Sequence, residues 1–248
     1  MDWPDGKSFA FTVFDDTDNA TLANVSEVYR LLADLGIRTT KSVWPSRAPE
    51  VDPSSGSTCE DPEYVGTERV STWRRVIYDI ATGFRNRGKY RGQVEGDPLF
   101  WGDLCREKIK YCRCFPFPEI DTLSLCPFMP YHDPLRPYVN YWFASAEGYD
   151  VGSYLGLISE QNQDSLEMEG GACIVYTHFA SGFVRDGRLD MRFRGLMERM
   201  AQKKGWFVTT CELLDFLLER NGPHDITDYE RRHLEQKWLW HKLRTGTT

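Results

Sequence analysis

The sequence predicts an α/β protein with a mostly parallel sheet. Runs rich in apolar and β-branched residues alternate along the chain with segments of helical periodicity. The clearest strands cover residues 7–14 and 172–177, and the first is followed by a helical pattern and a second strand at 37–44. Strand, helix and strand in this order predict a parallel βαβ unit with a right-handed crossover.

The first strand stops at two adjacent carboxylates, Asp15 and Asp16, and a helix begins soon after them. The helical stretch has apolar residues at helical spacing and ends at Gly36, a typical stop signal. Asp16 or Asp18 is therefore placed to cap this helix. A cap explains one acid and leaves Asp15 unexplained, which favours a functional role for the pair.

The middle of the chain is less regular. Residues 45–66 are rich in Pro, Ser, Gly and acids and have no clear period, which predicts an unusually long loop. Residues 127–141 carry four prolines and four phenylalanine or tyrosine side chains, which predicts a loop packed by its own rings. The remaining expected elements are helices at 70–84 and 100–111 and weaker strands at 112–117 and 121–126.

Helices and one short strand are expected after residue 150. The periodicity predicts helices at 153–168, 191–204, 211–220 (with Thr210 as its cap) and 229–243, and a strand at 206–209. The last helix is highly charged. We therefore divide the chain into a main domain, residues 1–222, and a C-terminal helical extension, residues 223–248.

Composition excludes several classes of protein. With 248 residues, of which 41% are hydrophobic, the chain can build a substantial core. Its net charge of −7 argues against nucleic acid or an anionic membrane as the main partner. No apolar run approaches the ~20 residues that a membrane helix needs, and the first residues do not resemble a signal peptide, so we expect a cytoplasmic protein.

Seven cysteines are dispersed along the chain, and without an export signal we expect them to be reduced and mostly buried. Cys112 and Cys114 form the only close pair. Their spacing differs from that of a zinc knuckle or a thioredoxin-type motif, so we do not expect a cysteine metal site.

His178 follows the strand at 172–177 as Asp15 and Asp16 follow the first strand. The carboxyl ends of parallel strands lie on one face of a sheet or barrel, so these three residues are expected to converge. Two acids and a histidine on one rim suggest metal-assisted hydrolysis. The alternative for His178 is a hydrogen-bonded structural histidine.

Two of these motifs resemble those of a known family. Phe14-Asp15-Asp16-Thr17-Asp18 resembles the first motif of the polysaccharide deacetylases, the NodB-homology group, and Ile174-Val175-Tyr176-Thr177-His178 resembles their last. Segments 38–45, 95–105 and 126–134 resemble an uncharacterised branch of the same group. The resemblance implies an irregular (β/α) barrel with fewer than eight strands.

The resemblance also implies roles for the site residues. Asp15 would be the general base, Asp16 a metal ligand and His178 the general acid. The metal is usually zinc in this family, where it polarises the acetamide carbonyl and lowers the pKa of water. The implied reaction is hydrolysis of an N-acetyl group on a carbohydrate or another N-acetylated small molecule.

The chain departs from the family pattern at the remaining metal ligands. The family supplies them as a His-x-x-x-His motif after the second strand, but no histidine precedes His132 here. The motif-bearing segment is expected to be deleted near residues 64–66, which would leave the barrel incomplete and zinc binding weak. His132 is a possible substitute ligand, although pairing with Asp133 on the surface is the alternative. His224, His233 and His241 are expected to be solvated.

A rival hypothesis is a non-catalytic relative that binds carbohydrate or regulates another protein. Aromatic rings that stack on sugars would then carry the function. We expect Tyr131, His132 and Trp142 to contact a substrate in either case. Further aromatic candidates for stacking are Tyr138, Tyr141 and Phe143. A third hypothesis is a truncated product with an unpaired sheet edge and no independent function.

Overall fold

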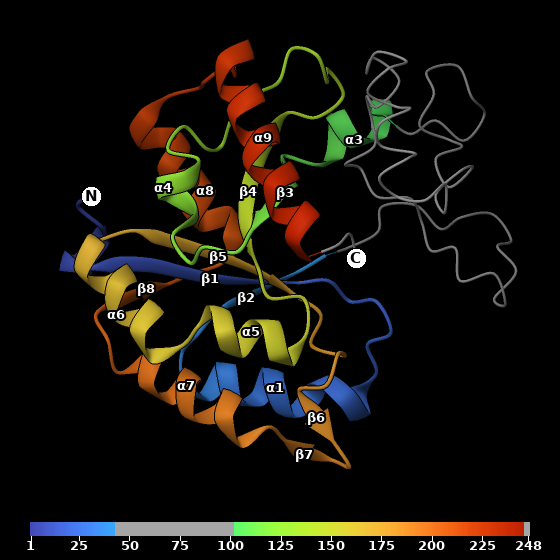
Figure 1. Ribbon diagram of the computed structural model, residues 1–248, viewed down its shortest axis with the longest axis vertical. Coiled ribbons are helices and arrows are strands. Elements are labelled where there is room, and N and C mark those ends of the chain that lie inside the picture. Colours follow the sequence, from blue (N-terminus) through green and yellow to red (C-terminus); the bar gives the residue numbers. More distant parts are fainter. Residues whose placement is uncertain (43–101, 246–248) are drawn as a thin grey trace, which may run out of the picture.

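The computed structural model describes residues 1–42 and 102–245. The loop expected at 45–66, the helix expected at 70–84 and the expected deletion lie outside the described residues. Within them, parallel strands alternate with helices, and the curled sheet forms a half-barrel (Figure 1). The α/β class and the parallel sheet predicted from the sequence are confirmed.

Among the described residues, the sheet has six strands, all parallel, in the order β2-β1-β5-β4-β3, with β8 also paired to β1. Their bounds are β1 Phe9–Asp15, β2 Thr39–Lys41, β3 Tyr111–Phe117, β4 Tyr141–Glu147, β5 Ala172–Thr177 and β8 Gly205–Phe207. A separate two-stranded ribbon joins β6 (Val184–Arg185) to β7 (Arg188–Leu189).

Strand β1 is the centre of the sheet. One edge pairs with β5 along residues 10–15. The other edge pairs first with β8, through residues 9–11, and then with β2, through residues 13–15. Both edges of β1 are therefore occupied along most of its length, and its carboxyl end lies next to that of β5.

The helices cover both sides of the sheet (Figure 1). Those on the outer side are α1 (Leu22–Asp34), α5 (Val151–Leu157), α6 (Glu160–Glu169) and α7 (Met191–Ala201). The others are η1 (Pro4–Gly6), α3 (Gly102–Lys108), α4 (Thr122–Leu125), α8 (Thr210–Asn221) and α9 (Asp228–Thr245).

The two faces of β1 belong to two separate clusters of apolar side chains. Phe9, Phe11 and Val13 pack against the outer helices. Ala10 lies in the second cluster, with residues of β3, β4, α8 and α9. This division follows from the alternation of side chains along a strand.

In three segments the structure differs from the prediction. Residues 121–126, expected as a strand, contain the short helix α4, because the Asp121 carboxylate caps it by accepting from the backbone N–H of Leu123 and Ser124. Strand β4 was not predicted beyond the aromatic loop. The helix expected at 153–168 is two helices, α5 and α6, that meet at Ile158 and Ser159.

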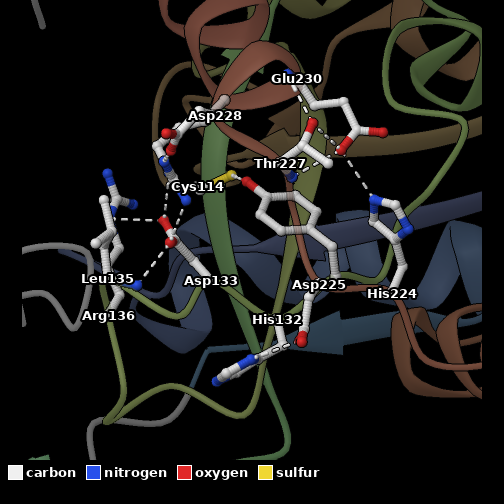
Figure 2. A network of polar contacts seen from close by, with 12 residues as sticks. Cys114, His132, Asp133, Leu135, Arg136, His224, Asp225, Thr227, Asp228 and Glu230 are labelled. Carbon is white, nitrogen blue, oxygen red and sulfur yellow. Dashed lines mark hydrogen bonds and ion pairs between the residues drawn. The ribbon is translucent and has the colours of Figure 1, made fainter.

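Helix α9 packs on β3 and is fixed by a network of charged side chains (Figure 2). Arg231 donates to both Asp133 oxygens, at 3.1 and 2.9 Å, and Asp133 is almost fully buried. Arg231 also pairs with Asp228 at 2.6 Å. The boundary predicted at residue 222 thus precedes a segment that completes the core through Ile226 and Leu234.

Five of the six described cysteines are buried thiols, as expected, and Cys211 is exposed. Within residues 1–42 and 102–245, no helix has the length and hydropathy required to cross a membrane.

Candidate functional site

The carboxyl ends of β1 and β5 meet as predicted from the sequence. Asp15 is in register with Thr177, and the Asp16 backbone N–H donates to the Thr177 carbonyl at 2.8 Å. This hydrogen bond extends the ladder by one residue. It places Asp16 beside His178, at the edge where parallel α/β proteins assemble their sites.

Asp16, Asp18 and His178 form one cluster, which we call the rim site. One potential ligand atom from each of the three lies within 4.8 Å of the others. The Asp16 Oδ2 to His178 Nε2 distance is 3.6 Å, and the two side chains are 13% and 21% exposed. Two carboxylates and one imidazole, partly open to solvent, supply oxygen and nitrogen donors of the kinds that zinc and similar divalent metals take. The residues present therefore fit such an ion.

Hydrogen bonds orient the Asp16 carboxylate. The Tyr176 hydroxyl donates to Oδ2 at 3.1 Å, and the Ser42 hydroxyl donates to Oδ1 at the same distance. The Tyr176 hydroxyl also lies 3.1 Å from His178 Nε2, and with the lone pair on Nε2 its single proton serves either Asp16 or His178. Outer partners of this kind fix the direction of ligand side chains at metal sites.

His178 is oriented from its other nitrogen. Nδ1 lies 3.2 Å from the Tyr149 carbonyl, which can only accept. A proton on Nδ1 satisfies this contact and, in the neutral ring, leaves the lone pair on Nε2, the atom that faces Asp16. The tautomer required of an Nε2 ligand is thus the one that the backbone favours.

Asp15 lies behind the rim site and is fully buried. Its Oδ1 accepts from the Phe179 backbone N–H at 2.9 Å, and its Oδ2 accepts from the Tyr29 hydroxyl of α1. Burial raises the pKa of the Asp15 carboxyl, and the bonds from Tyr29 and Phe179 offset part of that rise. Both oxygens are engaged, so Asp15 supports the turn that carries His178. A general base would need access to a water molecule, and Asp15 does not face solvent.

Asp18 was expected at most as a helix cap, and this expectation was wrong. Thr21 caps α1 instead, in a reciprocal pair with Asn24. Asp18 is therefore not needed for capping and joins the rim site. The signal that could have identified it is its position two residues after Asp16, because a bend at the strand end can turn both side chains to one side.

His132 lies far from the rim site. Its neighbour Tyr131 pairs with Trp142, near the amino end of β4, whereas the rim site lies at the carboxyl ends of the strands. Five residues of strand, roughly 16 Å, separate Trp142 from Glu147 at the carboxyl end. His132 Nδ1 contacts Asp225 at 2.9 Å and not Asp133, which pairs with Arg231 (Figure 2). His132 therefore cannot replace a missing ligand.

Tyr131 and Trp142 are core residues. Both are almost fully buried, and the Tyr131 hydroxyl lies 3.0 Å from the Cys114 sulfur. Their rings have no free face on which a sugar could stack, so the structure disagrees with the substrate contacts expected of them.

The rings nearest the rim site are those of Phe14 and Tyr176. They stack with centroids 6.3 Å apart, and the edge of the buried Phe143 meets Phe14 at 6.1 Å. The Arg113 guanidinium lies 3.7 Å from the centre of the Tyr176 ring. Phe14 and Tyr176 are half-buried, whereas Tyr131 and Trp142 at the amino end are almost fully buried.

Comparison of the chain with protein-family models, curated proteins and solved structures finds no match at the level of significance applied.

Proposed function

We propose that the rim site binds a divalent metal ion, most simply zinc, through Asp16, Asp18 and His178. We further propose that the protein is a metal-dependent hydrolase of the polysaccharide deacetylase type. The substrate would be an N-acetylated carbohydrate, and the half-barrel an incomplete form of that family's barrel. The observation that carries the proposal is the convergence of three ligand atoms within 4.8 Å at the strand ends.

When bound, the metal would polarise the acetamide carbonyl and lower the pKa of a water molecule. The protein's own residues hold and orient the components. Tyr176 and Ser42 fix Asp16, the Tyr149 carbonyl fixes the His178 tautomer, and Asp15 holds the backbone at Phe179. Phe14, half-buried beside Tyr176, would provide the surface for a sugar ring.

His178 cannot be ligand and general acid at once through the same nitrogen. In this proposal Nε2 is the ligand atom, which replaces the role implied by the family resemblance. Asp15 is likewise a positioning residue in place of a base, because its two oxygens already accept hydrogen bonds.

The first test is calorimetric titration of the chelator-treated protein with zinc. We expect one ion per chain and at least a ~100-fold loss of affinity in Asp16→Asn or Asp18→Asn, since each change removes one of three ligands. Asp34→Asn, on the exposed end of α1, makes the same chemical change away from the site and should leave the affinity unaltered. Equal zinc binding in all three variants would overturn the assignment.

The second test is release of acetate from N-acetylglucosamine oligomers by the zinc-loaded protein. Burial of Asp15 specifically favours a second candidate, a non-catalytic carbohydrate-binding relative. Binding of the oligomers without release of acetate would support that candidate over the hydrolase.

A further inference from the structure

A second surface feature lies on α9, away from the rim site. A groove of about 560 Å³ separates this helix from the end of β3. Phe117 and Pro118 line one side, and Glu119 stands exposed there. The opposite side is the helix itself.

The helix presents a single face to the groove. The lining residues of this face are His233, Gln236, Lys237, Trp240, His241 and Arg244. Positions 233, 237, 240, 241 and 244 follow the spacing of one helical stripe. Leu234 and Lys242, both buried, lie outside that stripe and attach α9 to the sheet. Apart from His241, whose Nε2 contacts Glu147, the groove-facing residues are additional to the helix's packing residues.

The cations of this stripe are not neutralised. Among the described residues, neither Lys237 nor Arg244 forms an ion pair, and Glu119 is the single carboxylate that lines the groove. This contrasts with a chain whose net charge is −7. Lys237 and Arg244, without an ion-pair partner among the described residues, form a local positive field suited to an oxyanion.

An aromatic ring accompanies the positive charges. Trp240 is 63% exposed, although large apolar side chains are usually covered. Its indole lies between the turns that carry Lys237 and Arg244, and the Arg244 guanidinium is 5.9 Å from its centre. An exposed indole flanked by cations can pack on a ring while its neighbours bind a charged substituent.

The groove is held in place from the buried side of α9. His241 Nε2 and Lys242 Nζ each contact Glu147, at the end of β4, at 2.5 Å. Arg231 fixes the first half of the helix to Asp133. Because these anchors lie on either side of residues 233–240, the side chains of that part of the stripe project from a helix fixed to the sheet, which lowers the entropy lost on binding.

We propose that this groove binds an oxyanion carried on a ring, namely a sugar bearing a carboxylate or a phosphate. Lys237 and Arg244 would pair with the anion, and Trp240 would pack on the ring. The site is independent of the metal proposed above, and it extends the same edge of the sheet. Neighbouring strands are ~4.8 Å apart, so the end of β3 lies roughly 10 Å from that of β5.

The test is calorimetric titration of the full chain, with chelator present, with glucuronate, glucose 6-phosphate, inorganic phosphate and glucose. We expect one of the two anionic sugars to bind at least ~10-fold more tightly than glucose and inorganic phosphate. Whichever binds identifies the anion as carboxylate or phosphate. The affinity should fall with added salt.

Variants of α9 locate the binding. The double variant Lys237→Gln with Arg244→Gln should bind the anionic sugar at least ~10-fold more weakly. Trp240→Ala should weaken binding of the sugar but not of inorganic phosphate. Arg232→Gln, an exposed residue of the same helix outside the groove, is the matched control and should bind as the wild type does. Equal affinities for glucose and the anionic sugars, or an unaffected double variant with an intact far-ultraviolet spectrum, would overturn the proposal.

Discussion

Two pairs of a histidine and a carboxylate lie at the same edge of the sheet. Asp16 and His178 lie at the ends of β1 and β5. Glu147, at the end of β4, accepts from His241 of α9. Both pairs join residues far apart in the sequence, and they differ in what surrounds them.

The difference is the balance of charge. Glu147 also accepts from Lys242, and the three side chains are 10% exposed or less. The rim site has a second carboxylate, Asp18, and within the described residues no lysine or arginine pairs with Asp16. A buried lysine thus supplies at Glu147 the positive charge that a metal ion would supply at Asp16. A histidine beside a carboxylate therefore does not identify a site until the remaining charge is counted.

The largest effect is expected when the free energy of unfolding of Glu147→Ala is compared with that of Asp16→Ala. Removal of Glu147 leaves Lys242 buried without its partner, and we expect the free energy of unfolding to fall by about 3–5 kcal/mol. Asp16→Ala removes one of two neighbouring acids, so in the absence of metal the loss should be under about 1 kcal/mol. Urea denaturation of both variants measures the difference.

The double variant Glu147→Ala with Lys242→Met is the control for that experiment. It removes both charges, so most of the stability lost in the single variant should return. Equal losses in Glu147→Ala and Asp16→Ala would contradict the contrast.

A smaller effect is expected behind the rim site. Tyr29→Phe deprives buried Asp15 of one of its two hydrogen bonds, which should cost about 1.5 kcal/mol of unfolding free energy. Because that bond holds the Asp15 pKa down, the pKa should rise further in the variant. Urea denaturation and carboxyl NMR give the two readouts. Tyr229→Phe, on an exposed ring, should change neither.

The smallest effect is a dependence on pH. Burial raises the pKa of Glu147, but the bonds from Lys242 and His241 outweigh it, so the pKa lies below its ordinary value of 4.5. A carboxyl with a lowered pKa stabilises the fold above its unfolded value, and that contribution is lost as the pH falls through the folded pKa.

The comparison that isolates this contribution is wild type against Glu147→Gln. The wild type should be more stable at about pH 6, and its advantage should shrink below 4.5. An advantage that stays constant down to about pH 3 would show that Glu147 contributes no pH-dependent stability.

The sequence was sufficient to predict the elements that have a strong hydrophobic period or a distinct end. Strands β1 and β5 are runs of apolar residues, and α1 and α7 have apolar stripes, so local physics determines them. Asp16 and His178 were placed together because parallel strands end at one edge. This part of the site follows from two local patterns and one rule of topology.

The remainder depended on contacts between distant segments. Trp142 and Tyr131 look like surface aromatics in a proline-rich loop, and their burial results from the packing of α8 and α9 against β3 and β4. His241 was expected to be solvated because its helix is highly charged, but Glu147, which it contacts, lies 94 residues earlier. No pattern within either segment encodes such a pairing.

The position of β1 in the sheet has a consequence for folding. This strand precedes all of its partners in the chain, and they are spread from residue 39 to residue 207. Pairings of such long sequence separation slow folding, because the entropy of closing large loops is lost before the contacts form. On the ribosome, β1 must therefore wait for β5 and β8 to emerge. Truncated chains that end before residue 205 would leave part of one edge of this buried, apolar strand unpaired, which makes interrupted synthesis a step at which this protein is prone to aggregate.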